Sequence, residues 1–85
     1  MNRISLEFLT RSGCHLCDDA APAVRRAARA LGGAVEVVDI EGDDAFTRDY
    51  GLRIPVVRLD GVIIAEGSFS AFQLWWRIVR RRRRR

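Results

Sequence analysis

Residues 4–18 read ISLEFLTRSGCHLCD. Apolar and polar side chains alternate from Ile4 to Phe8, which is the period of a β-strand, and the pattern stops at Thr10-Arg11-Ser12-Gly13. From Leu16 onward, apolar residues recur at the spacing of one helical face. The pair Cys14 and Cys17 therefore lies where an expected strand passes into an expected helix.

The rest of the chain predicts the end of the first helix and five elements after it. The helix that begins at Leu16 bends at Pro22 but continues to Gly32-Gly33, where glycine permits the left-handed backbone that ends a helix. Asp60-Gly61 between two apolar runs is a strong hairpin signal. The elements after the first helix are a strand over Ala34–Ile40, a helix over Ala45–Tyr50, strands over Val56–Leu59 and Val62–Ala65, and a helix from Ala71 to about Arg80.

This order, β-α-β-α-β-β-α, predicts the fold class. Two right-handed crossovers followed by a hairpin build a mixed four-stranded sheet with helices on both faces, which is an α/β sandwich of three layers. A chain of 85 residues has room for a single domain. We place that domain at residues 1–80 and a basic tail at residues 81–85.

The net charge of +4 comes from one end of the chain. Six of the fifteen arginines form the run Arg80–Arg85, and without them nine cations face eleven acidic residues. No apolar run approaches the roughly 18 residues of a membrane span, and Met1 leads into the first strand instead of a signal peptide. We therefore expect a cytoplasmic protein, in which a cysteine pair is more often redox-active or metal-binding than structural.

The cysteine pair predicts thiol chemistry. Cys14 should lie at the start of the first helix, where free backbone N–H groups favour a thiolate. Cys17 lies one helical turn later, close enough for a disulfide that forms and breaks without moving the fold. We assign Cys14 as the nucleophile and Cys17 as the resolving thiol. His15 either stabilises the Cys14 thiolate as a cation or is a solvated bystander.

Metal binding is the competing chemistry for this pair. A structural zinc site needs four ligands, and the chain offers only two cysteines and one histidine. We expect no metal in a single chain, although two chains could share a zinc ion or an iron–sulfur cluster through four thiolates. A further alternative is a non-enzymatic binding module whose basic tail contacts a polyanion.

In the order of its features, the chain resembles the thioredoxin fold. These features are a strand, Cys-x-x-Cys at the head of a helix, Ile54-Pro55 before a hairpin, and Gly67 before a closing helix. The short length and minimal set of elements resemble the glutaredoxins in particular, and residues 10–18 are similar to a small glutaredoxin-like family. Pro22 also stands where thioredoxins carry a helix-kinking proline. The resemblance covers about residues 4–80.

The resemblance implies a substrate site beside the cysteines. Pro55 takes the place of the family's cis-proline, which faces the cysteine pair and leaves the backbone of Ile54 free to pair with an extended thiol substrate. Arg11 matches the basic residue with which glutaredoxins hold a carboxylate of glutathione.

Two positions depart from the glutaredoxin pattern near this site. Arg53 stands where glutaredoxins usually have threonine, and Glu66 replaces the first glycine of their Gly-Gly pair. The charge of Glu66 opposes the docking of glutathione, whereas the amides of Gly67 and Ser68 suit one of its carboxylates. The candidate substrate-binding residues are Arg11, His15, Ile54, Pro55, Gly67 and Ser68.

The last helix should pack on the sheet through its aromatic residues, because a small domain needs a large aromatic contribution to its core. That face comprises Phe72, Trp75, Trp76 and Val79, and it is extended by Ala71, Leu74 and Ile78. The surplus apolar surface near Leu74 suggests a place for a partner. We expect the arginine run beyond to be a solvated, frayed tail, and attraction to anionic lipid, nucleic acid or an acidic partner is its alternative role.

The sequence thus predicts a monomeric dithiol–disulfide oxidoreductase. We expect it to reduce disulfide-containing or glutathionylated proteins and to be reduced by glutathione or by a thioredoxin-reductase-type system. Glutathione is the expected co-substrate, and no bound cofactor is expected.

Overall fold

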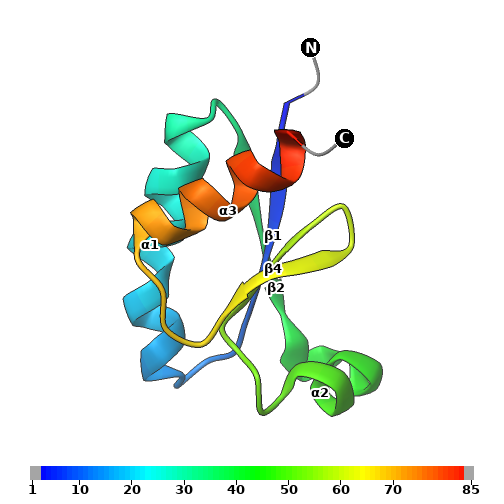
Figure 1. Ribbon diagram of the computed structural model, residues 1–85. Coiled ribbons are helices and arrows are strands. Elements are labelled where there is room, and N and C mark those ends of the chain that lie inside the picture. Colours follow the sequence, from blue (N-terminus) through cyan, green and yellow to red (C-terminus); the bar gives the residue numbers. More distant parts are fainter. Residues whose placement is uncertain (1–2, 84–85) are drawn as a thin grey trace.

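The computed structural model describes residues 3–83 and contains the predicted elements in the predicted order (Figure 1). The strands are β1 (Ser5–Thr10), β2 (Ala34–Asp39), β3 (Val56–Leu59) and β4 (Val62–Glu66), and the helices are α1 (His15–Ala30), α2 (Asp44–Tyr50) and α3 (Ala71–Arg83). A single 3₁₀ turn, Ile40–Gly42, joins β2 to α2 and was not predicted. α1 is continuous through Pro22, as expected.

The four strands form one mixed sheet in the order β2-β1-β3-β4. β1 and β2 are parallel, and the other two pairs are antiparallel. Asp60 and Gly61 both have left-handed backbone angles, φ 54° and 78°, as the two-residue turn of a tight hairpin requires. An irregularity between Val57 and Arg58 shifts the register, so that Glu66 lies opposite Val56. The predicted mixed sheet and hairpin are confirmed.

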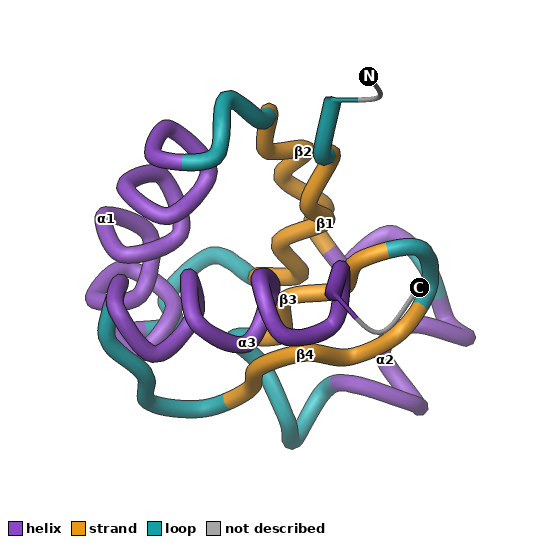
Figure 2. Tube along the Cα trace, turned by 45° about the horizontal axis from the view of Figure 1, so that its top comes forward, coloured by secondary structure: helices purple, strands orange, loops and turns teal. Residues whose placement is uncertain are grey.

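The sheet separates two apolar cores, because successive side chains of a strand point to opposite faces. Leu6 and Phe8 belong to the larger core, which α1 and α3 cover. Leu9 belongs to a smaller core on the opposite face, where Phe46 and Tyr50 of α2 pack. Figure 2 shows α1 and α3 together beside the sheet, and α2 apart from them. The three-layer α/β arrangement is therefore confirmed.

The predicted packing face of α3 is wrong for Phe72 and Trp76, whereas Trp75 packs against the larger core as predicted. The partner surface predicted near Leu74 is also wrong, because Leu74 is buried. Leu74 and Ile78 are fully buried in the larger core, whereas Phe72 is 71% exposed and Trp76 is 43% exposed. Residues 72 and 76 lie about 200° around the helix from residues 74 and 78, so only one of these pairs can face the sheet. The buried Phe69, just before the helix, supplies an aromatic ring to that core instead.

α3 also ends later than predicted. It continues to Arg83, so the expectation of a frayed tail is wrong for residues 81–83, while Arg84 and Arg85 lie outside the described residues. Arginines in the last turn stabilise a helix because they interact favourably with its negative end. Within residues 3–83, no helix has both the length and the apolar character needed to cross a membrane.

Candidate active site

Cys14 is the N-cap of α1. The chain leaves β1 at Thr10 and turns at Gly13, whose φ of +78° is a left-handed value that glycine adopts without strain. Cys14 is extended, its carbonyl oxygen accepts the N–H of Asp18 at 3.0 Å, and its Sγ accepts the N–H of Cys17 at 3.1 Å. A sulfur thus occupies the capping place that a hydroxyl or carboxylate oxygen usually takes. The expectation that Cys14 lies at the start of the helix is confirmed.

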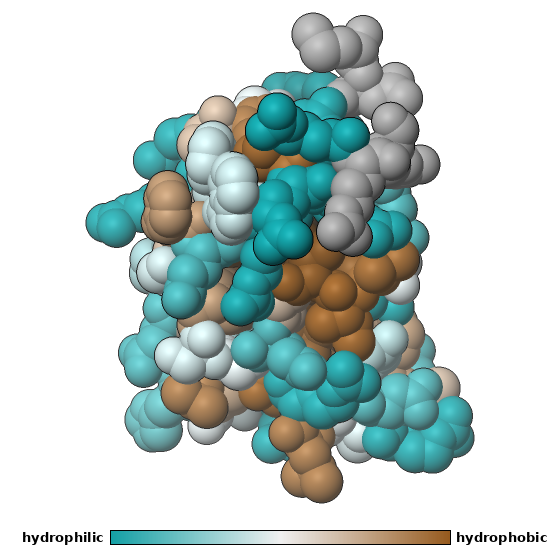
Figure 3. Space-filling view, viewed as in Figure 1, coloured by the Kyte–Doolittle hydropathy of each residue, from teal (hydrophilic) through white to brown (hydrophobic). Residues whose placement is uncertain are grey.

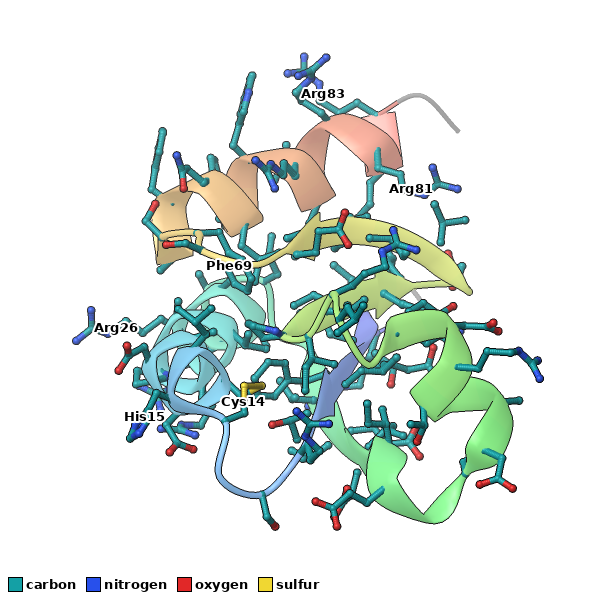
Figure 4. The ribbon with its side chains drawn as sticks, turned by 90° about the horizontal axis from the view of Figure 1, so that it is seen from below. Cys14, His15, Arg26, Phe69, Arg81 and Arg83 are labelled. Atoms are coloured by element: carbon teal, nitrogen blue, oxygen red, sulfur yellow. A yellow bond between two sulfur atoms is a disulfide. The ribbon has the colours of Figure 1, made fainter. Side chains whose placement is uncertain are left out.

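Cys14 and Cys17 form a disulfide (Figure 4), with their Cα atoms 5.2 Å apart. The two residues differ in access to solvent, since Cys17 is 1% exposed whereas Cys14 is partly exposed. Leu16 between them is 53% exposed, so an apolar side chain borders the pair on the outside. Exchange chemistry needs one reachable sulfur and one protected sulfur, and this arrangement provides both.

The loop before β3 forms the wall next to the disulfide. The Ile54–Pro55 peptide bond is cis, and both side chains are buried. Ile54 shares the smaller core with Cys17, and Cys14 packs against the same cluster. The structure therefore brings together the cysteine pair and the Ile54-Pro55 segment, although the two are far apart in the sequence.

Two backbone groups that we expected to be free are occupied. The N–H of Ile54 donates to the carbonyl oxygen of Tyr50 at 3.1 Å, because the chain closes a turn after α2. The N–H of Gly67 donates to the carbonyl oxygen of Pro55 at 2.9 Å, because the loops before and after the hairpin lie side by side. The prediction of a free Ile54 backbone is therefore wrong for its N–H, and the prediction of a free Gly67 amide is wrong, for the protein in this state.

Arg53 and Glu66 form an ion pair at the same place. Arg53 Nε donates to Glu66 Oε2 at 2.8 Å, and a second guanidinium nitrogen donates to Oε1 at 3.4 Å. The hydrogen bond with Glu66 is the main reason that the pKa of Arg53 is raised above its ordinary value. The negative charge of Glu66, which we expected to oppose an anionic substrate, is thus largely offset by its partner.

A second ion pair lies within the sheet, and its arginine also attaches α2 to the sheet. Arg58 of β3 contacts Glu7 of β1 at 2.9 Å, lies over the rings of Phe46 and Tyr50, and donates to the Tyr50 hydroxyl at 3.3 Å. Burial lowers the pKa of Arg58, but its hydrogen bonds with Glu7 and Tyr50 outweigh that effect and raise it. This network fixes Tyr50, whose carbonyl oxygen in turn holds Ile54.

The other predicted site residues are on the surface. Arg11, His15 and Ser68 are exposed, and Figure 4 shows His15 on the side of α1 away from the disulfide. Within residues 3–83, no three His, Cys, Asp or Glu side chains are grouped as a metal site requires. His15 is therefore a surface residue whose side chain lies away from the disulfide, although it is next to Cys14 in the sequence.

A groove of about 350 Å³ begins at Cys17 and runs between α1 and the β2 edge of the sheet. It is lined by Cys17, Asp18, Ala21, Val24 and Arg25 from α1 and by Phe8, Thr10, Val35 and Val37 from the strands. Most of the residues that line the groove are apolar.

Solved structures with similar folds are known. The protein XcR50 from X. campestris is 37% identical to this chain, with a TM-score of 0.77, and the match covers 88% of this chain and 96% of that one. Protein Ne2328 from Nitrosomonas europaea is 24% identical, with a TM-score of 0.74 and coverage of 87% and 89%. Thioredoxin 1 from Thermosipho africanus is 18% identical, with a TM-score of 0.66 and coverage of 93% and 94%. These likenesses show a thioredoxin-like fold.

Similarity also extends to related sequences. The uncharacterized protein Rv0508 of Mycobacterium tuberculosis is 33% identical over 66 residues, which are 72% of this chain and 68% of that protein. The model of the glutaredoxin-like domain (DUF836) matches residues 5–79. With its cysteine pair at the start of α1 and its thioredoxin-like sheet, the chain belongs to the glutaredoxin-like domain family.

Proposed function

We propose that this protein is a thiol–disulfide oxidoreductase that reduces disulfides or glutathionylated thiols of other proteins. The observation that supports this most directly is the Cys14–Cys17 disulfide at the first turn of α1, with one partly exposed and one buried sulfur. A disulfide in this position closes a short loop and can open without disturbing either core.

The cycle transfers two electrons from the dithiol to a substrate disulfide. The Cys14 thiolate attacks one substrate sulfur, a mixed disulfide forms, and the other substrate sulfur leaves as a thiolate that takes up a proton. The Cys17 thiol then loses its proton and attacks Cys14 Sγ, which releases the second substrate thiolate and leaves the Cys14–Cys17 disulfide. An external thiol reductant restores the dithiol by the reverse exchange.

The surroundings of Cys14 suit a nucleophile. Its sulfur accepts the N–H of Cys17, and it lies at the positive end of a helix of 16 residues. Both features stabilise the thiolate relative to the thiol. Cys17 is buried against Ile54 and Val56, so a substrate reaches Cys14 first.

Glutathione is the proposed co-substrate, with a thioredoxin-reductase-type system as the other candidate reductant. Arg11 on the loop before Cys14 would bind one carboxylate of glutathione. Ser68 would offer its amide to the other carboxylate, since the amide of Gly67 is already paired. We further propose that the protein works as a cytoplasmic monomer, with no resident cofactor.

The test uses two single variants. Cys14→Ser should abolish reduction of a peptide disulfide, while Cys17→Ser should accumulate a mixed disulfide that intact-protein mass spectrometry detects. Circular dichroism on both variants checks that each is folded. Equal turnover by the Cys14→Ser variant and the wild-type protein would refute the assignment.

A further inference from the structure

The outer face of α3 is an unusual surface for a small domain. Phe72 and Trp76 are exposed, and Trp75 is half-buried between them. The rings of Phe72 and Trp75 stack at 6.0 Å, and those of Trp75 and Trp76 stack at 6.3 Å. We call this row of three rings the aromatic row. Phe72 and Trp76 lie on the side of α3 away from the core, so the core does not require them. Trp75 also packs against the larger core.

The same helix carries the excess of positive charge that gives the protein its net charge of +4. Arg80, Arg82 and Arg83 are exposed at its end, and Figure 4 shows Arg83 directed away from the domain. Glu66 is the last acidic residue of the sequence, so residues 67–85 have seven arginines and a net charge of +7, whereas residues 1–66 have a net charge of −3. In Figure 3, pale and brown side chains, which are intermediate and hydrophobic, lie over α3 beside teal hydrophilic ones.

We propose that this face of α3 docks on an anionic lipid surface. The aromatic row would enter the boundary between headgroups and acyl chains, and Arg80, Arg82 and Arg83 would bind lipid phosphates. A helix with aromatic side chains and arginines on one outer face lies in such an interface with its axis along the surface. The charge separation orients the protein, since the acidic remainder of the chain is repelled by the same surface.

Nucleic acid is a poorer occupant because of how the rings are arranged. Stacking of bases requires aromatic faces that are open to the ligand. Here the Trp75 ring is half-buried and already has Phe72 and Trp76 as stacked neighbours, with interplanar angles of 25° and 29°, so it is not an open platform for a base. The surface is also a single convex helix, whereas a strand of nucleic acid is usually tracked by a groove.

Docking would leave the cysteine pair accessible. Figure 4 views the protein from the end that carries Cys14, with α3 along one side and the disulfide between α1 and the sheet. A lipid surface against the outer face of α3 would therefore lie beside the disulfide and would not cover it. Lipid contact is independent of the cysteine chemistry proposed above, and its test does not depend on that proposal.

The two tryptophans of the chain are Trp75 and Trp76, so intrinsic fluorescence reports on this helix alone. The full chain is mixed with vesicles of phosphatidylcholine, or of phosphatidylcholine and phosphatidylglycerol in equal parts. With anionic vesicles we expect co-flotation, a blue shift and quenching by brominated lipid, all of which high salt weakens. With neutral vesicles we expect no binding. Absence of binding to anionic vesicles at low salt would overturn the proposal.

Variants separate the two parts of the surface. Arg82→Ser with Arg83→Ser should lower the partition coefficient about thirty-fold, since each arginine near an anionic surface contributes about 1 kcal/mol. Phe72→Ser with Trp76→Ser should abolish quenching of Trp75. Arg25→Ser with Arg26→Ser removes the same charge from the exposed side of α1 and should have little effect. An equal loss in this control would contradict a site on α3.

Two other occupants give distinct results. If the surface binds nucleic acid, an oligonucleotide should bind more tightly than anionic vesicles, and Phe72→Ser with Trp76→Ser should not weaken it. If it binds a second copy of the chain, analytical ultracentrifugation should show a dimer that this double variant dissociates, with no vesicle binding. Either result would overturn the proposal.

Discussion

At the scale of single residues, Arg53 and Glu66 are two departures from the glutaredoxin pattern that together form one ion pair. Taken separately, Glu66 predicts repulsion of an anionic substrate, and Arg53 is only an unexpected residue before Ile54. The register of the hairpin brings Glu66 opposite Val56. The side chains of Arg53 and Glu66 form an ion pair there. The hairpin was predictable from Asp60-Gly61, but its register shift was not, because no single residue marks it.

Glu66→Gln tests whether this pair lies in the path of glutathione. The substitution removes one negative charge and releases the Arg53 guanidinium, which can then bind a carboxylate of the substrate. We expect the second-order rate constant for reduction of the Cys14–Cys17 disulfide by glutathione to rise about two- to fivefold, in line with an exposed ion pair. Timed alkylation of the free thiols followed by mass spectrometry measures this rate.

Glu36→Gln is the matched control, because it removes an exposed acidic residue from β2, at the other end of the sheet order. It should leave the rate constant unchanged. A rise of equal size in both variants would mean that only net charge matters. No rise in the Glu66→Gln variant would place the pair outside the glutathione path.

At the scale of elements, α3 is the helix that sequence reasoning oriented incorrectly. Its apolar arc is wider than one face of the sheet requires, and the sequence predicts that the aromatic part is core and the part near Leu74 is surplus. The structure buries Leu74 and Ile78 instead, where the helix packs against α1 and β4. Periodicity gives the width of an apolar arc but not which part of it meets the sheet, because that depends on the helices packed beside it.

The orientation of α3 predicts losses of stability of very different size for two substitutions on this helix. Leu74→Ala leaves a cavity in the larger core and should lower the free energy of unfolding by about 2–5 kcal/mol. Phe72→Ala changes an exposed side chain and should lower it by about 0.5 kcal/mol or less. Urea denaturation followed by circular dichroism measures both values. A larger loss for Phe72→Ala than for Leu74→Ala would show that the aromatic face is the buried one.

At the scale of the whole molecule, the order of elements, the sheet and the place of the cysteine pair could be predicted from local patterns. These features depend on side-chain period and on turn residues that lie close together in the sequence. The contacts that complete the site could not be predicted, because they join distant segments. Tyr50 holds the N–H of Ile54, Pro55 accepts from Gly67, and Arg58 attaches α2 to the sheet.

These contacts make the site a product of the entire fold. The cysteines come from the junction of β1 and α1, while the wall beside them comes from the loops that flank the hairpin. The excess of positive charge lies elsewhere, at the end of α3, and the aromatic row lies on the same helix. The molecule therefore separates a region suited to thiol exchange from a region suited to an anionic surface.

The redox potential of the Cys14–Cys17 couple tests the central claim most directly. The protein is equilibrated in dithiothreitol buffers of graded potential, and the fraction of free thiols is measured by alkylation and mass spectrometry. A working dithiol couple should give a two-electron transition with a midpoint between about −270 and −200 mV, the span of thioredoxins and glutaredoxins. A disulfide that stays closed at about −300 mV and below would be structural, and that result would contradict the account.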